Sequence, residues 1–300
     1  MINMKTVSVI IPTYKNRGGL ADSIDSVISQ DCPYSLEVIV VDDNEPNSEY
    51  RASTEILMEQ YVLNPLVKYV RHEKNKNGAA ARNTGINASK GDFIAFLDDD
   101  DLFLPNKLML QVDYLDNHVD CHAVYCFLCR KGKTVSTSVT EGNGIRDILL
   151  LQSNYPTSTL MFRRDALEAI KGFDETFQRH QDFELMLRYF EAGYTIGCVP
   201  EVLVEMGLNQ GENIPTGEKL NQLKAYFLEK FNRYIERENS LTPGFKSKVY
   251  AKHYAGVFLN HIKNKNFLMA LNALKFLPKA PATFMTVIWK SFVVHIKAEA

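Results

Sequence analysis

Four short apolar segments in the first third of the chain alternate with helical patterns, and this alternation constrains the fold more than any other feature. The segments are VSVIIPTY at 7–14, EVIVVDD at 37–43, VKYVRHE at 67–73 and FIAFLDDDD at 93–101. Between them lie LADSIDSVISQ, EILMEQYV and NGAAARNTGINAS, which are typical of helices. Alternating strands and helices predict an α/β fold with a mostly parallel, Rossmann-like sheet flanked by helices.

Three of these segments end in residues that could contribute to a binding site. They are Pro12, Thr13 and Tyr14 after the first, Asp42 and Asp43 after the second, and Asp98, Asp99, Asp100 and Asp101 after the fourth. Ligands of open α/β sheets collect outside the carboxyl ends of the parallel strands. We therefore expect these side chains to meet at one edge of the sheet.

The run of four aspartates is the most unusual of these endings, because adjacent carboxylates repel and raise one another's pKa. One of them could cap the helix predicted by LPNKLMLQVDYL, but a cap needs only one. A divalent cation such as Mg²⁺ or Mn²⁺ prefers oxygen ligands and would turn the repulsion into coordination. A calcium loop of the EF-hand type fits poorly, because Phe103 stands where that loop has glycine.

The segment after the first strand, YKNRGG, lacks the glycine-rich patterns that hold dinucleotides or nucleoside triphosphates. A bound diphosphate would need another source of neutralisation, and a cation at the aspartates would supply it. Arg82, set among small residues, could reach the same edge and bind a phosphate, or could pair with an acid. Asp42 could accept hydrogen bonds from a base or a ribose, or could form a turn with Asp43 and Asn44.

Asp182 stands at the start of a predicted helix in the second half of the chain, QDFELMLRYFEAG. It could serve as the N-cap of that helix. It could also be a general base at the mouth of a site. The helix dipole would keep the carboxylate ionised and lower its pKa, whereas the nearby Glu184 would raise it.

The C-terminal part is basic, with nine lysines and a single acid, Glu299, between residues 239 and 300. Its apolar pattern predicts helices, the first starting at Thr242 and Pro243. These helices could pack on the rest of the chain as a bundle. The last one could instead lie on a membrane surface, with Phe284, Ile288, Trp289 and Phe292 in the lipid and lysines at anionic headgroups.

The overall composition excludes some classes of protein. A net charge of −2 and a pI of about 6.4 give no general attraction to nucleic acid, so we expect no such partner. The odd number of cysteines, five, and the absence of a signal pattern at the N-terminus predict reduced thiols and a cytoplasmic protein. Cys126 and Cys129 form a C-x-x-C pair without a second ligand pair, which favours ordinary thiols over a zinc site.

Taken in order, VSVIIPTY, EVIVVDD, ARNTGINASKGDFIAFLDDDDLFLP, GFDE and HQDFELMLR resemble the family 2 inverting glycosyltransferases over about the first two thirds of the chain. The resemblance implies a glycosyltransferase A-type fold, with a catalytic domain at 1–205 and a helical C-terminal extension at 206–300. The nucleotide-binding half would extend to about residue 105 and the acceptor half over about 106–205.

The resemblance also implies roles for single residues. The family's Asp-x-Asp-Asp element matches Asp98, Asp100 and Asp101, with Asp99 in the variable position and Pro105 as the usual proline. Asp100 would then be the direct metal ligand, and Asp98 a ligand or ribose contact. Pro12, Thr13, Tyr14 and Asp42 match positions that hold the nucleoside. Asp182 matches the base, and Gln181 replaces the glutamate that usually precedes it.

The implied reaction moves a sugar from a nucleoside-diphosphate sugar to an acceptor hydroxyl with inversion and with a divalent metal. The acceptor would be a glycan or a lipid-linked glycan of a cell-surface polysaccharide, and the enzyme could work at the inner face of the membrane. Two alternatives stay open. A metal-dependent nucleotidyltransferase would share the sheet and the carboxylates, and a non-catalytic sugar-nucleotide-binding module would share the pocket.

Overall fold

The structure is a computed structural model that describes residues 4–15, 18–135, 139, 141–153, 155–207 and 215–299. The chain forms two compact units. The first comprises Met1–Gly144 and Asn154–Gln210, and the second comprises Ile145–Ser153 and Gly211–Ala300. The short segment Ile145–Ser153 thus belongs with the C-terminal helices, although it comes well before residue 205 in the sequence.

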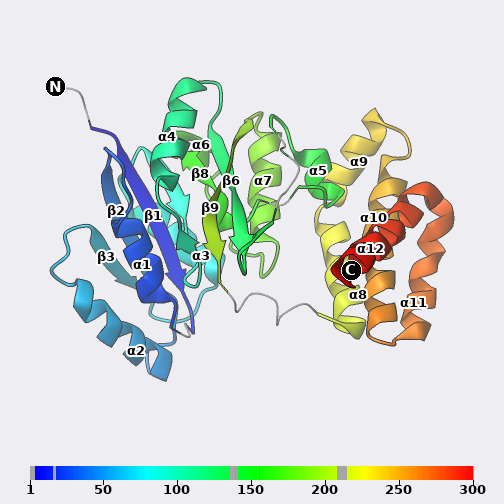
Figure 1. Ribbon diagram of the computed structural model, residues 1–300, viewed down its shortest axis with the longest axis horizontal. Coiled ribbons are helices and arrows are strands. Elements are labelled where there is room, and N and C mark those ends of the chain that lie inside the picture. Colours follow the sequence, from blue (N-terminus) through cyan, green and yellow to red (C-terminus); the bar gives the residue numbers. More distant parts are fainter. Residues whose placement is uncertain are drawn as a thin grey trace. The chain divides into compact units, whose positions relative to one another are not determined.

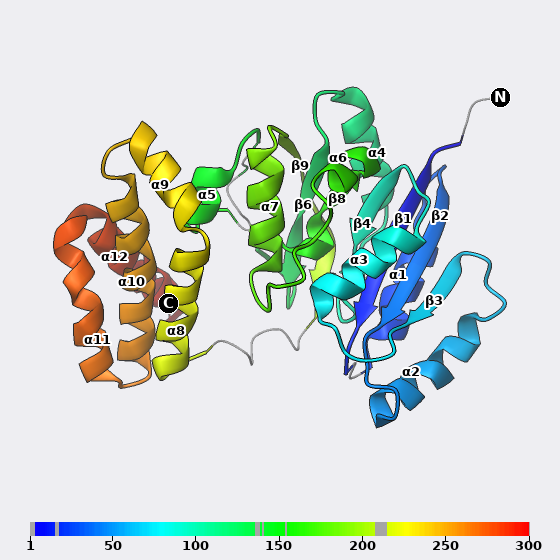
Figure 2. The same cartoon turned by 180° about the vertical axis from the view of Figure 1, so that it is seen from behind.

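The first unit is an α/β fold built on one sheet with helices packed against it, as the sequence predicted (Figures 1 and 2). In chain order its elements are β1 (Thr6–Thr13), α1 (Leu20–Ile28), β2 (Ser35–Asp42), α2 (Glu49–Met58), η1 (Glu59–Tyr61), β3 (Val67–Arg71), α3 (Gly78–Ala88), β4 (Phe93–Phe96), β5 (Leu102–Phe103), α4 (Lys107–Asn117), β6 (Ala123–Arg130), β7 (Lys133–Val135), η2 (Thr157–Thr159), β8 (Met161–Arg163), α6 (Arg164–Ala169), α7 (Gln181–Glu191) and β9 (Ile196–Met206).

The strand order within the described residues is β3-β2-β1-β4-β8-β6-β9-β5, with β7 paired to β6. The first four strands of this order are parallel. Beyond β4 the sheet is mixed, because β8 runs antiparallel to both β4 and β6, whereas β6 and β9 are parallel. The chain leaves β1 toward β2 on one side and returns to β4 on the other, which creates a switch point where ligands bind.

The core of the parallel half explains the sequence pattern that predicted it. Val7, Val9 and Ile11 of β1 are fully buried, as are their neighbours in β2 and β4. The small residues of α3 let this helix lie close to the sheet. A Cβ added to Gly85 would lie 2.3 Å from Cγ2 of Ile10, well inside van der Waals contact.

The second unit is helical, which confirms the predicted C-terminal extension. Its elements are α5 (Ile145–Leu149), α8 (Gly217–Lys230), α9 (Asn232–Leu241), α10 (Phe245–Lys263), α11 (Phe267–Ala273), η3 (Leu274–Lys279) and α12 (Pro281–Glu299). Helix α10 starts at Phe245, after a left-handed Gly244, and thus later than the predicted start at Thr242 and Pro243. No helix among the described residues combines the length and the apolar character needed to cross a bilayer.

The structure corrects the predicted lipid-facing side of the last helix. Phe284 is fully buried and packs with Ala251 and Ala255 of α10. Ile288 is partly buried against the same cluster, and Trp289 is 69% exposed. The side chain of Phe292 lies outside the described residues. Helical periodicity identified an apolar stripe on α12 but could not show that part of this stripe faces the bundle.

Candidate active site

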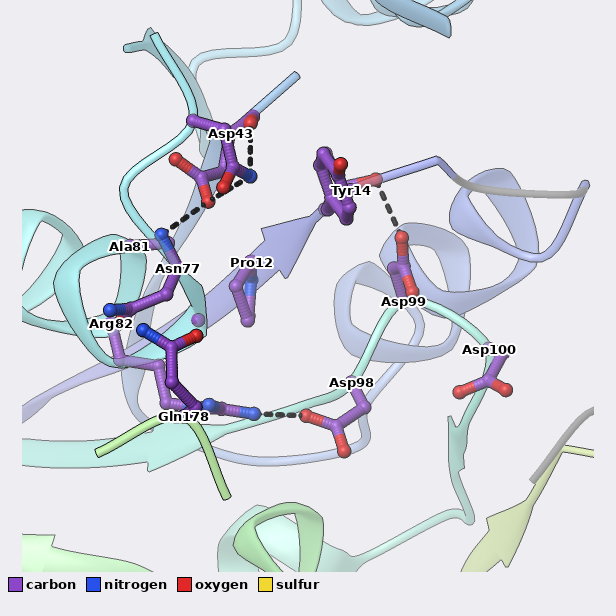
Figure 3. Close-up of a pocket in the computed structure, with 13 residues that line it drawn as sticks. Pro12, Tyr14, Asp43, Asn77, Ala81, Arg82, Asp98, Asp99, Asp100 and Gln178 are labelled. Atoms are coloured by element: carbon purple, nitrogen blue, oxygen red, sulfur yellow. Dashed lines mark hydrogen bonds and ion pairs between the residues drawn. The ribbon is translucent and has the colours of Figure 1, made fainter. Parts of the chain in front are cut away.

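An open cavity of about 410 Å³ lies where β1 and β4 end, at the switch point of the sheet. Figure 3 shows the side chains around it. The lining residues are Pro12, Thr13, Tyr14, Asp43, Asn75, Asn77, Gly78, Ala81, Arg82, Asp98, Asp99, Asp100 and Gln178. The cavity therefore brings together all the residues predicted from the ends of the first and fourth strands except Asp101, and adds Arg82.

A second cavity of about 350 Å³ contains Asp182 and meets the first. Arg82, Asp98 and Gln178 line both cavities, so these three side chains form the boundary between them. The remaining lining residues of the second cavity are Asp101, Pro156, Thr157, Arg179, His180, Gln181, Asp182 and Met206. The predicted donor residues and the predicted base thus lie in adjoining spaces.

The first three aspartates of the acidic run project in different directions (Figure 3). Oδ1 of Asp98 accepts a hydrogen bond from Nη2 of Arg82 at 2.6 Å. Oδ2 of Asp99 accepts one from Oγ1 of Thr13 at 2.6 Å and so connects the run to the end of β1. Asp100 is half-buried in the cavity wall beyond Asp99. The chain turns immediately after them, since the amide of Asp101 donates to the carbonyl of Asp98 at 3.0 Å.

Asp101 differs from the other three because it anchors the loop. It is 1% exposed, and its carboxylate accepts hydrogen bonds from Oγ of Ser158 at 2.6 Å and from the amide of Gly207 at 2.9 Å. Its carbonyl accepts a bond from Oγ of Ser23 at 2.8 Å. Burial, followed by the charge of Asp98, raises the pKa of Asp101 to about 7.

Two glycines in neighbouring segments lie directly against the backbone of the acidic run. A Cβ added to Gly19 would lie 2.8 Å from the carbonyl oxygen of Asp99. One added to Gly207 would lie 2.1 Å from the carbonyl oxygen of Asp100. Any larger residue at either position would displace the loop that carries the aspartates, because backbone atoms cannot yield as a flexible side chain can.

The structure places Asp42 away from the cavity, contrary to the prediction. Asp42 is fully buried, where its carboxylate accepts hydrogen bonds from Tyr69 Oη at 2.5 Å and from the amide of Asn44 at 2.8 Å, and pairs with Nε of Arg51 at 3.2 Å. The next residue, Asp43, lines the cavity instead. Successive residues of an extended chain point to opposite sides, so this pair could not both face the site.

Asp43 organises the loop that leads into α3. Its carboxylate contacts Nδ1 of His72 at 2.7 Å and accepts hydrogen bonds from the amides of Lys76 at 2.8 Å and Asn77 at 2.9 Å. It also accepts one from Nδ2 of Asn75 at 2.9 Å. These bonds place Asn75 and Asn77 in the cavity wall, although neither asparagine was predicted as a site residue. Their only signal was the turn-forming character of KNKNG before a helix.

We expect Asp42→Ala to lower the free energy of unfolding by about 3–5 kcal/mol, because it leaves the buried guanidinium of Arg51 without its carboxylate. Denaturant unfolding measures this loss, and the exposed Asp31→Ala in the same unit is the control, expected to stay within about 0.5 kcal/mol of wild type. Normal stability of Asp42→Ala combined with lost nucleotide binding would contradict the structural role and restore the predicted one.

Arg82 connects the two cavities. It lies on α3 with an 11% exposed side chain, and its guanidinium packs over the ring of Phe173 at 5.5 Å. Besides the bond to Asp98, its Nη1 donates to Oε1 of Gln181 at 3.0 Å. Its buried Nε has no hydrogen-bond partner among the described residues. The structure therefore shows the alternative of a partly exposed arginine paired with an acid, since Arg82 pairs with Asp98 and keeps 11% of its side chain exposed.

Asp182 is the second residue of α7, and the N-cap position belongs to His180. Its carboxyl is partly exposed to the second cavity but is surrounded by protein atoms. Burial raises its pKa to about 6, the backbone amides of Phe183 and Asp182 and the charge of Arg82 act in the opposite direction, and Asp98 adds to the rise. A carboxylate with such a pKa can accept a proton near neutral pH.

Glu184 is paired with a cation on its own helix. It is 7% exposed, and Arg188 one turn later donates to both of its carboxylate oxygens. This ion pair offsets the charge that the sequence suggested would raise the pKa of Asp182.

The donor set of the acidic run suits a hard divalent cation only in part. Asp98 and Asp100 offer oxygen ligands at one cavity wall, as Mg²⁺ and Mn²⁺ prefer. Among the described residues, however, no three acidic, histidine or cysteine side chains lie together as a complete cage. This arrangement fits an ion held by one or two carboxylates together with water and substrate phosphates, which is how Mg²⁺ is usually bound.

Comparison with known proteins agrees with this geometry. Residues 8–184 match the family described as Glycosyl transferase family 2. An uncharacterized glycosyltransferase of Methanocaldococcus jannaschii is 26% identical over 228 residues, which make up 74% of this chain and 77% of that protein. Another from Haemophilus influenzae is 24% identical over 285 residues, covering 88% of this chain and 94% of that protein.

The fold is also that of a solved structure, the crystal structure of S. aureus TarS 1-349 in complex with UDP-GlcNAc. The two align with a TM-score of 0.64 and 18% sequence identity over 94% of this chain and 83% of that one. The family match itself extends from β1 to the first turn of α7 and thus contains the acidic run, Arg82 and Asp182. Since it covers more than half of the sequence, the chain belongs to glycosyl transferase family 2.

Proposed function

We propose that this glycosyltransferase takes its sugar from a nucleoside-diphosphate sugar and transfers it to an acceptor hydroxyl with inversion at the anomeric carbon. The observation that carries the proposal is the position of Arg82. Its guanidinium bonds to Asp98 in the first cavity and to Gln181, the neighbour of Asp182, in the second. One side chain thus joins the aspartates expected at the donor to the helix end that carries the expected base.

The first cavity is proposed to hold the donor. Pro12, Thr13 and Tyr14 border it at the end of β1, where the nucleoside would lie. Helix α3 begins at Gly78 in the cavity wall, and helix N-termini favour anionic groups such as a diphosphate. The complex of TarS with UDP-GlcNAc, on the same fold, supports a nucleotide sugar as the ligand.

The second cavity is proposed to admit the acceptor. Asp182 would take the proton of the acceptor hydroxyl, and the hydroxyl oxygen would attack the anomeric carbon from the face opposite the diphosphate. The new bond from oxygen to the anomeric carbon forms as the bond from that carbon to the diphosphate oxygen breaks. The nucleoside diphosphate leaves with the bonding electron pair, and the configuration of the anomeric carbon is inverted.

A divalent ion, Mg²⁺ or Mn²⁺, is proposed to be held by Asp100 and Asp98 together with the diphosphate. When bound, such an ion offsets the negative charge that develops on the leaving diphosphate. Asp99 and Asp101 would act through the loop, since one bonds to Thr13 and the other to Ser158 and Gly207. The acceptor class, a glycan or a lipid-linked glycan of a surface polysaccharide, remains part of this proposal.

Transfer from a panel of labelled nucleotide sugars, with and without EDTA, tests the proposal. We expect release of the nucleoside diphosphate to depend on an acceptor and to stop in EDTA. Transfer of the nucleoside monophosphate with release of a sugar phosphate would instead identify a nucleotidyltransferase. Tight donor binding without turnover for any acceptor would identify a binding module.

Thermal unfolding with UDP, GDP, dTDP and CMP should show which nucleotide the first cavity accepts. We expect one diphosphate to stabilise the protein by about 2.7 kcal/mol at a hundredfold excess over its Kd. The corresponding monophosphate should stabilise it less, because it lacks the β-phosphate that the α3 N-terminus, Arg82 and the proposed ion would contact. Equal shifts from all four nucleotides would contradict a selective nucleoside site.

A further inference from the structure

Helix α11 buries small side chains and exposes large apolar ones, which is the opposite of an ordinary bundle helix. It packs on α10 and η3 through its alanines, Ala270 and Ala273, which are 1% and 3% exposed. Its large apolar side chains point the other way: Phe267 is 60% exposed, Leu268 77% and Leu271 62%. Amphipathic helices of folded domains bury large apolar residues and expose small or polar ones, so this helix has an apolar face without a partner within the described residues of its unit.

The exposed apolar face is bordered by lysines. Ile262 is 40% exposed near the end of α10, which ends at Lys263, and Lys265 lies in the turn that follows. Lys275 and Lys279 follow in η3, where their ammonium groups lie 5.2 and 5.1 Å from the centre of the Phe276 ring, and all four lysines are exposed. We call the set of Ile262, Lys263, Lys265, Phe267, Leu268, Leu271, Lys275 and Lys279 the α11 patch. It contains no acidic residue, and Figure 2 shows α11 running along one side of α10.

We propose that the α11 patch docks on a membrane surface that contains anionic lipids. The chemistry of the patch fits both layers of such a surface. Phe267, Leu268 and Leu271 would enter the boundary between headgroups and acyl chains, and the lysines would meet the lipid phosphates. Because the region between residues 239 and 300 holds nine lysines and one acid, the surrounding charge adds to this attraction.

This surface differs from the one predicted from the sequence, which was the Phe284 side of α12. The α12 side is partly used to build the bundle, whereas the α11 patch has no such use within its unit. A protein held by the α11 patch would encounter acceptors carried on lipids. That consequence rests on the proposed function, but the docking itself does not, because it can be measured without donor or acceptor.

Co-sedimentation of the full chain with lipid vesicles tests the proposal. We expect binding to vesicles of phosphatidylcholine with phosphatidylglycerol, little binding to phosphatidylcholine alone, and a decrease at high salt as the charges are screened. The double variant Leu268→Glu/Leu271→Glu should bind at least about tenfold more weakly, since the insertion of a single leucine side chain corresponds to roughly that factor. Lys263→Gln/Lys265→Gln should weaken binding to the anionic vesicles several-fold.

Leu63→Glu is the matched control, because Leu63 is 92% exposed in the first unit and should leave binding unchanged. Circular dichroism and thermal unfolding should show that the α11 variants fold, as expected for side chains already facing water. Equal vesicle binding by wild type and Leu268→Glu/Leu271→Glu would overturn the proposal. The proposal would also be overturned if the wild-type chain does not bind vesicles but self-associates in light scattering through the same leucines. That result would assign the patch to a second copy of the chain.

Discussion

Asp182→Asn is expected to lower the rate of sugar transfer by about two to four orders of magnitude, the range that acid–base catalysis usually contributes. The substitution keeps the shape of the side chain but removes its ability to take the acceptor proton. Because Asp182 is not the N-cap of α7, the helix should remain intact. Donor binding should persist, because the first cavity is lined by other residues. Initial rates and nucleotide thermal shifts measure the two effects separately.

The control for Asp182→Asn is Glu184→Gln, two residues along the same helix. Glu184 is held by Arg188, so its loss should affect stability more than the chemical step. Asp174, another carboxylate of the second half of the chain, accepts bonds from the amide and hydroxyl of Thr176. Near-normal transfer by Asp182→Asn would place the base elsewhere. Failure of the variant to fold or to bind nucleotide would make Asp182 structural.

The pH profile provides a second readout of the same residue. Burial raises the pKa of Asp182 from 3.8 to about 6, and only the ionised carboxylate can accept a proton. We therefore expect the rate to fall as the pH drops through about 6, by about tenfold for each further unit, whereas an ordinary aspartate would lose activity only near pH 4. The residual activity of Asp182→Asn should lack this acid limb.

Gln181→Glu should move the acid limb of the pH–rate profile in a direction that follows from the charges around Asp182. A glutamate at this position would accept from Arg82, as the amide oxygen of Gln181 already does. It would thereby offset the guanidinium charge that lowers the pKa of Asp182, and would add a negative charge of its own. Both effects raise the pKa, so the acid limb should shift to higher pH. A shift to lower pH would contradict both effects.

The sequence predicted which strand ends meet, because topology alone decides this. Parallel strands have their carboxyl ends at one edge, so the ends of β1 and β4 had to meet, and Thr13 and Asp99 are in fact hydrogen-bonded. The prediction failed where a shift of one residue along a strand decides which face of the sheet a side chain occupies. Asp42 and Asp43 are the same residue type at the end of the same strand, and only the register of β2 shows that Asp43 faces the cavity.

A run of identical residues likewise does not show which residue has which role. Nothing in the sequence separates Asp101 from the three aspartates before it, although it is the one that bonds to Ser158 and Gly207. The second unit shows a related limit. The periodicity of α11 marked an apolar face but not that alanines would fill the interior and leave Phe267 outside. Such choices depend on which neighbours a helix meets, and these come from distant parts of the chain.

Asp100→Ala is expected to reduce transfer by about three orders of magnitude or more, while Asp101→Ala is expected mainly to destabilise the protein. Asp100 is half-buried in the wall of the first cavity, where it is proposed to hold the ion that offsets charge on the leaving diphosphate. A bound metal is worth several kcal/mol of transition-state stabilisation, and each 1.36 kcal/mol is a factor of about ten in rate. The protein should stay folded, because the bonds to Ser158 and Gly207 that anchor the loop are made by Asp101.

Asp101→Ala is the variant with which Asp100→Ala should be compared. Asp101→Ala leaves the amide of Gly207 and the hydroxyl of Ser158 without their acceptor, at about 1–3 kcal/mol for each buried donor, partly offset because a buried carboxylate is itself costly. Denaturant unfolding should therefore separate the two variants, and transfer rates with Mn²⁺, with Mg²⁺ and in chelator should show whether Asp100 acts through a metal. If wild type works equally well in chelator, the metal is dispensable and Asp100→Ala should lose little. If Asp100→Ala instead unfolds as readily as Asp101→Ala, the acidic run supports the loop more than it supports the reaction.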